Sequence, residues 1–498
     1  MLTLYIMPKK GGAAIASGGY GCVFSPPLPC EKGSISKMAH FKGKTVSKLM
    51  DKYDAEEEVN SVKNVYKALK TLSGVNDYFL FPVEMCKPEY ATQSDLEGFS
   101  GKCRKFYNNS RIAPNNRGDF PQSARIINMP HGGFELHKLL KEYKGSGSLA
   151  AYMFLAIANL IQKAIVPMNK RGVYHCDLKG ENMMVDGFGN IRIIDWGLGG
   201  VFKKTARNKL PEFIEDRPFQ FNLPFSSLIF NDRLKTNKCH SDKSYTLDGS
   251  PEWMIPELVK SYLDNLRLGD QSHYSYSREN IAPILFSCDY LAKKDDIFTY
   301  TVNSYLVKAI TSFTTFTKGE YKFDKERYCE NVYLKNVDIW GALITLLPYL
   351  ENGAPALGGS EKAALRMVLV KYLYSSTFAA KAIPIPELVG DLQYMAMLLI
   401  NRKGPLYIRS QLQSWGPSFT HLYNSLVPLK DHLEVIKPHT PSPEAPKAKA
   451  TKPKTKAKAK TKRESKGKTT KPKSETRKRC PNGTRRNKKT GECEPVKK

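Results

Sequence analysis

The chain has 498 residues, of which 41% are hydrophobic and 25% charged, a composition that indicates a folded protein of about three structural units and excludes a fibrous or largely disordered one. Its formal net charge is +29, and residues 440–498 contribute +17 of this, which leaves +12 for the first 439 residues. The first 439 residues and the basic tail are therefore expected to be separate structural units.

The ten cysteines are spread along the chain without a Cys-x-x-Cys pair, which favours a reducing setting inside a cell. The apolar stretch at the N-terminus is too short for a secretory signal, and we find no uninterrupted run of about 18 apolar residues that would span a membrane. We therefore expect an intracellular protein without a transmembrane segment.

In chain order, residues 16–38 alternate β-forming residues with Gly and Pro and predict a hairpin, and residues 45–72 show a helical pattern with an acidic start. Residues 73–120 are rich in Gly, Asn, Ser and Pro and predict an insertion, before Ala124–Met129 predicts a buried strand. The later elements are expected to be a helix, a strand and two buried helices, at 149–170, 191–195, 337–350 and 363–375. A β-rich part thus precedes a helical one.

A glycine-rich motif, SGGYGCV, occupies Ser17–Val23 on the predicted hairpin. Backbone without Cβ can approach phosphate oxygens closely, although such hairpins are also commonly plain turns. Lys37 follows in an apolar stretch that predicts a buried strand, where an ammonium group needs an anion. Glu58 on the next helix would supply that anion, with Glu56 and Glu57 as rivals; the alternative is an exposed acidic first turn.

The strongest motif is YHCDLKGENM at Tyr174–Met183, followed by Asp195-Trp-Gly. The pattern His-x-Asp-Leu-Lys-x-x-Asn with a later Asp-x-Gly resembles the catalytic and metal-binding loops of eukaryotic-type serine/threonine protein kinases, with Trp196 where Phe is usual. This resemblance implies phosphoryl transfer, which depends on positioning and charge neutralisation more than on covalent chemistry.

The resemblance implies a role for each polar side chain of these loops. Asp177 would accept or orient the proton of the substrate hydroxyl, and Lys179 would steady the transferred phosphoryl group. Asn182 would act with them and, together with Asp195, would hold Mg²⁺, or Mn²⁺ in its place, through oxygen ligands.

The same resemblance places ATP in the N-terminal part. The glycine hairpin would cover the phosphates, Lys37 would grip them, and Glu58 would pair with Lys37. Ile127 would be the gatekeeper, and Asn128–His131 would form the hinge that binds adenine. The residues expected to contact the nucleotide are Gly18, Gly19, Tyr20, Gly21, Val23, Lys37, Glu58, Ile127, Asn128 and Met129.

Later motifs continue the resemblance. Gly249–Glu257, GSPEWMIPE, resembles the end of an activation segment, and Asp338 in Asp-Ile-Trp-Gly resembles the buried residue that braces the catalytic loop. Cys176 replaces the usual Arg, which implies an enzyme that is not switched by activation-loop phosphorylation. The form DLKGEN, together with Ser250, favours Ser and Thr as substrates. The apolar residues 218–230 are expected to pack onto the large lobe.

The predicted fold is α+β: a bilobal protein-kinase-like fold with a small β-rich N-lobe, a large α-helical C-lobe, insertions and a disordered basic C-terminal tail. An extension at 1–11 precedes the kinase domain at 12–436, in which the lobes meet near residue 130. The insertions are expected at about 73–120, 203–245 and 258–337. The tail is expected to consist of a disordered Lys-rich linker at 437–479 and a small basic two-cysteine module at 480–498.

Residues 447–479 of the tail contain no aromatic residue for stacking on bases, so the predicted partners are the phosphates of nucleic acid or acidic proteins. A nuclear-import signal or a solubilising tail are the alternatives. Cys480 and Cys493 would pair only in an oxidising compartment. The tail and the insertions together resemble the kinases of large nucleocytoplasmic double-stranded DNA viruses, which implies the host cytoplasm and the virion as locations.

The function expected from the sequence is that of an ATP-dependent serine/threonine protein kinase, which transfers the γ-phosphoryl group of Mg-ATP to Ser or Thr hydroxyls of proteins. Two alternatives are a catalytically weak kinase-fold scaffold with a nucleic-acid-binding tail, and a small-molecule kinase. The presence of Lys37, Asp177, Asn182 and Asp195 argues against the scaffold, and the segment 249–257 argues against the small-molecule kinase.

Overall fold

The computed structural model describes most of residues 12–404 and two short strands near the C-terminus, 484–486 and 493–495. Between 12 and 404 it leaves out residues 19, 39–42, 92–97, 111, 115–117, 144, 187–188, 203–209, 216, 232–251, 270–271, 287–290, 318–319 and 352–353. The chain divides into two compact units, 1–436 and 437–498. In the second unit, β14 (Thr484–Arg486) pairs antiparallel with β15 (Cys493–Pro495); the predicted linker at 437–479 and Cys480 lie outside the described residues.

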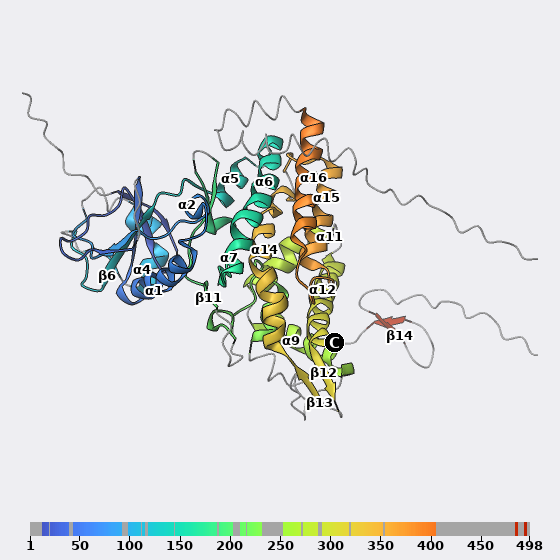
Figure 1. Cartoon of the computed structure of the whole chain (residues 1–498). Coiled ribbons are helices and arrows are strands. Elements are labelled where there is room, and N and C mark those ends of the chain that lie inside the picture. Colours follow the sequence, from blue (N-terminus) through green and yellow to red (C-terminus); the bar gives the residue numbers. More distant parts are fainter. Residues whose placement is uncertain are drawn as a thin grey trace, which may run out of the picture. The chain divides into compact units, whose positions relative to one another are not determined.

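A six-stranded antiparallel sheet forms the N-terminal part of the first unit (Figure 1), with the strand order β1-β2-β4-β6-β5-β3. The strands are β1 (Ala13–Ser17), β2 (Cys22–Ser25), β3 (Ser36–Lys37), β4 (Thr45–Asp51), β5 (Glu84–Cys86) and β6 (Ala124–Pro130). β1 and β2 form the predicted hairpin, and β6 is the predicted buried strand. Helix α1 (Lys52–Leu69) packs on this sheet through Ala55 and Val59, which contact Met50 and Ile127.

The predicted helix over 45–72 is a strand followed by a helix. β4 pairs with β2 on one side and β6 on the other, and the helix begins only after Asp51, whose side chain accepts a hydrogen bond from the Tyr53 amide at 2.9 Å. Val46, Ser47, Leu49 and Met50 of β4 are all buried. A strand that is buried on both faces lacks the two-residue period that separates strands from helices, which explains the error.

The segment predicted as an insertion at 73–120 supplies one strand of the sheet, β5. The rest contains the short helices α2 (Val75–Tyr78), α3 (Phe99–Lys102) and α4 (Arg104–Ser110). Two disulfides attach this segment to the β-rich part: Cys22–Cys103 and Cys30–Cys86, which join residues 81 and 56 positions apart. These disulfides are at odds with the reducing setting expected from the cysteine spacing.

The C-terminal part of the first unit is helical and is built around α6 (Gly147–Leu160), α14 (Leu334–Ile344) and α16 (Ile385–Lys403) (Figure 1). α6 continues through a π-helical turn into α7 (Val166–Lys170), so that the predicted apolar helix is one continuous rod. Gly147–Lys170 is long and apolar enough to cross a membrane, but a core helix of a soluble protein passes the same test. Here 78% of its 18-residue apolar window is buried inside the structure.

The remaining elements near the catalytic motifs are β7 (Phe134–Glu135), α5 (Leu136–Glu142), β8 (Val173–Tyr174), β9 (Met183–Val185), β10 (Ile191–Ile193) and β11 (Gly200–Val201). The elements further along the chain are α9 (Ile255–Gly269), α10 (Ser272–Tyr276), α11 (Ala282–Phe286), α12 (Leu291–Ser312), β12 (Thr314–Thr317), β13 (Glu320–Phe323), α13 (Lys325–Tyr328) and α15 (Gly359–Leu369). The predicted insertion at 258–337 therefore contributes helices to the core, where Phe298, Val302 and Tyr305 of α12 are buried. The fold is α+β, a small β-rich lobe followed by a large helical lobe, as a bilobal kinase fold requires.

Candidate active site

The catalytic motif lies in the loop between β8 and β9, and Asp338 of α14 braces its backbone. Asp338 Oδ1 accepts a hydrogen bond from the Cys176 amide at 2.8 Å, and Oδ2 accepts from the His175 amide at 3.1 Å. The side chain of Asn169 also donates to Oδ2, at 2.8 Å. Cys176 has φ 54°, a left-handed conformation that is unfavourable for a side chain with Cβ. The two amide hydrogen bonds to the fully buried Asp338 hold the loop in this conformation, as the resemblance implied.

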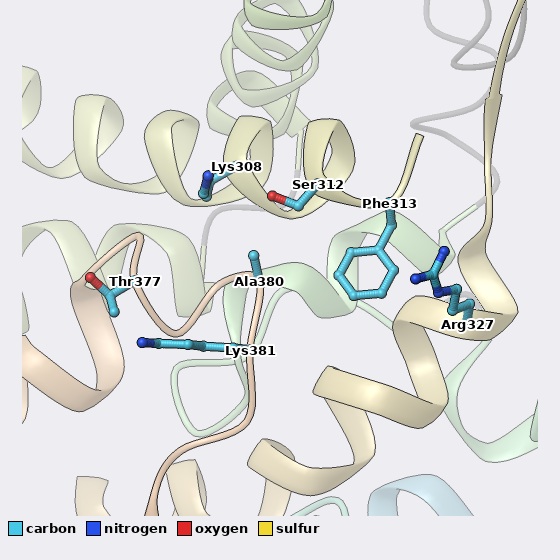
Figure 2. Close-up of a pocket in the computed structure, with 7 residues that line it drawn as sticks. All are labelled: Lys308, Ser312, Phe313, Arg327, Thr377, Ala380 and Lys381. Carbon is cyan, nitrogen blue, oxygen red and sulfur yellow. The ribbon is translucent and has the colours of Figure 1, made fainter. Parts of the chain in front are cut away.

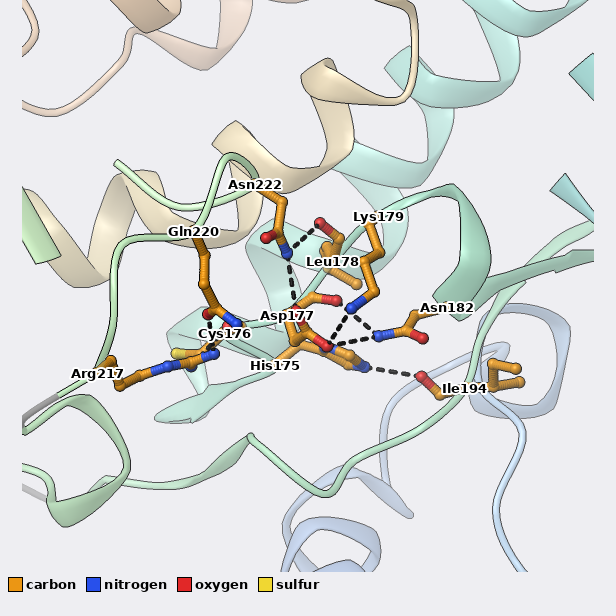
Figure 3. Close-up of polar contacts among 10 residues, drawn as sticks. All are labelled: His175, Cys176, Asp177, Leu178, Lys179, Asn182, Ile194, Arg217, Gln220 and Asn222. Atoms are coloured by element: carbon orange, nitrogen blue, oxygen red, sulfur yellow. Dashed lines mark hydrogen bonds and ion pairs between the residues drawn. The ribbon is translucent and has the colours of Figure 1, made fainter. Parts of the chain in front are cut away.

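Asp177 is the centre of a polar network (Figure 3). Its Oδ2 accepts hydrogen bonds from Lys179 Nζ and Asn182 Nδ2, both at 2.9 Å, and its Oδ1 accepts from Asn222 Nδ2 at 2.8 Å. Burial alone would raise the pKa of this carboxyl, but the Lys179 charge and the hydrogen bonds from Asn222 and Lys179 hold the pKa below its ordinary value. Asp177 is therefore an oriented, ionised carboxylate at neutral pH.

Asn182 and Asp195 carry oxygens of the type that Mg²⁺ prefers. Asn182 uses its amide nitrogen to donate to both the backbone oxygen and Oδ2 of Asp177, which leaves its amide oxygen as the ligand. Asp195 is exposed and has φ 64°. Within the described residues, no three His, Cys, Asp or Glu gather into a cluster that could hold a metal. The two residues thus fit a cation that takes its other ligands from a bound phosphate group or water.

The lysine that pairs with Glu58 is Lys48 of β4. Lys48 Nζ lies 2.6 Å from Glu58 Oε2. In the sheet, Lys48 stands opposite Val23 of β2 and Ile127 of β6, so these three side chains share one face. A Cβ on Gly21 would come within 3.0 Å of Lys48 Cγ and Cε, which shows that the glycine hairpin passes directly over this lysine.

The charge of Lys48 is held in place by two acidic side chains. Burial lowers the pKa of its ammonium group, but Glu58 and Asp195 more than compensate and raise the pKa above its ordinary value. Asp195 belongs to the Asp-Trp-Gly motif, so the electrostatic coupling links the strand lysine with the candidate metal ligand. Lys48 is therefore a cation that Glu58 fixes beside the glycine hairpin and whose charged form Asp195 also favours.

The prediction that Lys37 pairs with Glu58 is wrong. Lys37 is exposed on β3, at the opposite edge of the sheet from β1 and β2. The sequence did not predict Lys48 as the partner of Glu58, because the pattern placed Lys48 in a helix, where it would be a surface residue. The overlooked signal is the β-forming run Thr45–Met50, which ends just before the first turn of the Glu58 helix.

The other predicted nucleotide contacts lie either on the glycine hairpin or on strand β6. Gly18 donates its amide to the Gly21 carbonyl at 2.9 Å and closes the hairpin turn, with Tyr20 exposed at its tip; Gly19 lies outside the described residues. Ile127 is buried on the Lys48 face, and Met129, two residues on, shares that face.

Asn128 points the other way. Its side-chain nitrogen donates to Glu84 Oε1 at 3.0 Å on the face opposite Lys48, and its backbone carbonyl accepts from the Val83 amide at 2.7 Å. Both groups are therefore engaged within the β-rich lobe. The predicted hinge would have to bind adenine through the residues after Asn128.

An aromatic stack connects the catalytic loop with helix α1. The Trp196 ring lies 5.0 Å from His175 and 5.5 Å from Phe81, and Phe81 lies 5.2 Å from Tyr66 of α1, measured between ring centroids. Trp196 also donates its indole N–H to the Leu80 carbonyl at 3.4 Å. The residue at the usual Phe position therefore contacts both lobes.

A segment without a recognised motif, Arg217–Asn231, completes the site. We call it the strap. Besides Asn222, the strap makes two further polar contacts. Arg217 Nη1 donates a hydrogen bond to the Cys176 carbonyl at 2.7 Å, and the Phe221 carbonyl accepts one from Trp340 Nε1. The apolar part of the strap is packed onto the large lobe, as expected, but its polar contacts with the catalytic loop were not predicted, because nothing in the spacing marks Asn222.

The predicted end of the activation segment is only partly described. Gly249, Ser250 and Pro251 lie outside the described residues, and Glu257 is exposed on α9. Among the described residues of 195–257, the strap supplies the side chain that touches Asp177.

A solvent-open cavity of about 480 Å³ lies between the C-terminal end of α12, α13 and the loop before α16 (Figure 2). Its lining residues are Lys308, Ser312, Phe313, Arg327, Thr377, Ala380 and Lys381. None of them belongs to the catalytic motifs, so we do not assign the nucleotide to this cavity.

Comparison with known proteins supports the same chemistry. Residues 122–219 match the protein kinase domain family, a stretch that contains β6, the catalytic loop and Asp195 and ends three residues before Asn222. The chain is similar to the serine/threonine-protein kinase PknD of Chlamydia trachomatis, with 26% identity over 207 residues for serovar L2b and 27% for serovar D. Each alignment covers 37% of this chain and 21% of the relative, so the chain matches about a fifth of the length of these curated relatives.

Proposed function

We propose that this protein is an ATP-dependent serine/threonine protein kinase. The observation that carries the proposal is the placement of an oriented carboxylate, Asp177, in one unit with a glycine hairpin and the Lys48–Glu58 pair beneath it. A hydroxyl substrate needs the carboxylate, and a nucleotide phosphate needs the hairpin and the fixed cation.

In this proposal Lys48 takes the role that the sequence suggested for Lys37. Its ammonium group would bind the nucleotide phosphates while Glu58 holds it in position. Asn182 and Asp195 would hold Mg²⁺, which supplies positive charge that neutralises the phosphates when bound. Lys179, already 2.9 Å from Asp177, would stabilise the charge of the transferred group from the side of the substrate.

The chemical step follows from the state of Asp177. The hydroxyl oxygen of the substrate forms a bond to the γ-phosphorus while the bond from that phosphorus to the β–γ bridging oxygen breaks, and ADP leaves. The hydroxyl proton passes to the Asp177 carboxylate, which is ionised at neutral pH because its pKa is low. The substrate class, Ser or Thr of proteins, is supported by the DLKGEN loop and by the similarity to the serine/threonine-protein kinase PknD.

The test is transfer of labelled γ-phosphate from Mg-ATP to a basic and an acidic protein, followed by phosphoamino-acid analysis. Asp177→Asn and Asp195→Asn keep the side-chain shape and should each abolish transfer. Asp264→Asn, an exposed carboxylate on α9, is the matched control and should retain it. Label on Ser and Thr that only the first two variants lose would support the proposal. A folded protein that binds ATP but labels no protein would refute it, and would favour a scaffold or a small-molecule kinase.

A second activity is favoured by the charge of the tail. Residues 440–498 carry a net +17, and residues 437–498 form a unit of their own. We propose that this unit binds the phosphates of nucleic acid, or acidic proteins, without reading sequence. The full chain should bind double-stranded DNA with an affinity that falls steeply with salt, and a chain ending at residue 436 should lose that binding. Equal binding by both chains would contradict the proposal.

The proposed location is the host cytoplasm and the virion of a large DNA virus, which rests on the resemblance of the tail and insertions. The two disulfides support the virion part of this proposal, because disulfides persist on virion surfaces and are reduced in the cytosol. Free-thiol counts on protein from cytoplasm and from particles would test it: four fewer accessible thiols are expected only in the particles.

A further inference from the structure

The two oxygens of the Asp177 carboxylate are not equivalent. Oδ2 accepts hydrogen bonds from Lys179 and Asn182, which fill its two acceptor directions. Oδ1 accepts a hydrogen bond only from Asn222 among the contacts in Figure 3, at 2.8 Å. One acceptor direction of Oδ1 is thus left for a substrate hydroxyl, and Asn222 fixes where that direction points.

The side chain of Asn222 is held in one position by burial and by two hydrogen bonds. Its side chain is 1% exposed, and its Nδ2 also donates to the Leu178 carbonyl at 3.2 Å. Both N–H groups of the amide are therefore used on the catalytic loop. A charge-assisted hydrogen bond from a buried, fixed amide is stronger than one between neutral groups.

The strap that carries Asn222 is built into the core. Phe225, three residues on, packs edge-to-face against the rings of Trp340, Phe298 and Tyr305, with centroid distances of 5.3, 6.0 and 5.5 Å. Phe225 is 2% exposed. Swinging the strap away from Asp177 would pull this ring out of the core, so Asn222 is not a removable plug of the active site.

The strap also holds the catalytic loop at a second point. The buried Arg217 donates to the Cys176 carbonyl at 2.7 Å, and its other terminal nitrogen donates to Gln220 Oε1. Cys176 directly precedes Asp177, so the loop is fastened on both sides of the reacting carboxylate. Neither Arg217 nor Asn222 belongs to a motif that the sequence pattern revealed; Arg217 lies near the end of the matched range 122–219, and Asn222 lies beyond it.

We propose that Asn222 is the positioning residue of the kinase reaction: it aims Asp177 Oδ1 at the substrate hydroxyl. The inference rests on the proposed function for its catalytic part. Oδ1 is then the atom that receives the hydroxyl proton. The strap is the element that orients this acceptor.

The test compares Asn222→Ala, Asn222→Asp and the control Asp264→Asn in the full chain. Asp264 is exposed on α9 and belongs neither to the strap nor to the catalytic loop. Loss of one charge-assisted hydrogen bond should lower kcat of Asn222→Ala by about 10- to 100-fold. KM for ATP should stay within about twofold, because Asn222 does not touch the residues assigned to the nucleotide. Asp264→Asn should stay close to the wild type in both constants.

The split between the two constants separates positioning from a structural role. Asn222→Asp keeps the shape but places a second carboxylate where the donor was, so it should lower kcat at least as much as Asn222→Ala, again with little change in KM for ATP. An unchanged kcat in folded Asn222→Ala, or a loss that appears mainly in KM for ATP, would overturn the proposal.

A second measurement does not need activity. If Asn222 and Asp177 stabilise the fold through their hydrogen bond, the loss of stability in the double variant Asn222→Ala with Asp177→Ala should be smaller than the sum of the losses in the two single variants. Urea unfolding of the wild type and of these three variants would show it. Additive losses would overturn the inference even if the wild type proved inactive, whereas inactivity of the wild type alone would refute only the proposed function.

Discussion

Replacing Asp338 removes the brace of the catalytic loop, and its cost can be worked out from the hydrogen bonds. Two of the three donors that Asp338 accepts are backbone amides, those of His175 and Cys176, and both are buried. These amides cannot turn toward another partner, whereas the Asn169 side chain can, since it already donates to the Val173 carbonyl. Each stranded buried donor costs about 1–3 kcal/mol. Asp338→Ala should therefore lower the free energy of unfolding by about 2–6 kcal/mol, a large part of the 5–15 kcal/mol typical of a domain.

Urea unfolding followed by circular dichroism measures this loss. Asp338→Asn should fall between wild type and Asp338→Ala, because one amide oxygen can still accept. Asp264→Ala on the surface of α9 should change the free energy of unfolding by no more than about 0.5 kcal/mol. The reasoning would be refuted by an Asp338→Ala protein within about 1 kcal/mol of wild type with the same dependence on urea.

Three further outcomes are expected. Lys48→Met should reduce phosphate transfer by at least about 100-fold, since it removes the fixed cation under the glycine hairpin, while Lys37→Met should stay within about twofold; equal losses in labelled-ATP assays would contradict the assignment. Because the pKa of Asp177 in the folded protein lies below its ordinary value, its charge stabilises the fold above about pH 4, the ordinary pKa of a carboxyl, and this stabilisation is lost as pH falls through the lower folded pKa. The rate constant kcat should therefore stay level from pH 8 to about pH 5. An acid limb of the kcat profile centred above pH 6 would argue against Asp177 as the base. Reduction of the Cys22–Cys103 disulfide should cost about 2–4 kcal/mol and lower the thermal midpoint; alkylation of every cysteine in unreduced, unfolded protein would show that the bond is absent.

The catalytic loop could be predicted from sequence because its chemistry fixes residue types at short spacing. Asp177, Lys179 and Asn182 lie within six residues, and both Lys179 and Asn182 hydrogen-bond directly to Asp177. Asp195 is tied to the same loop by the short antiparallel pair β9–β10. Local motifs of this kind survive insertions elsewhere in the chain.

The strand lysine could not be identified in the same way. β4 is buried on both faces by its neighbours in the fold, and this burial removes the alternation that identifies a strand. Lys37, in contrast, stands among β-forming residues but at the edge of the sheet. Only the strand order, which is a long-range property, separates the two lysines.

The strap and the disulfides depend on long-range contacts as well. Asn222 is 45 residues from Asp177, and Cys22 is 81 residues from Cys103. Cysteine spacing alone does not determine pairing, and a single buried Asn within an apolar run carries no period. Both features became visible only when the fold placed these residues against each other.

The indole of Trp196 has a consequence for the design of inhibitors. Its N–H bond to the Leu80 carbonyl is one that the usual Phe could not make, and the ring is enclosed by Phe79, Phe81 and His175. A compound that needs the space behind Asp195 must first expel this ring. Displacing a buried Trp side chain costs about 3–5 kcal/mol, or roughly a 150- to 4,000-fold loss of affinity. Compound series that leave Trp196 in place are therefore the better starting point for this protein.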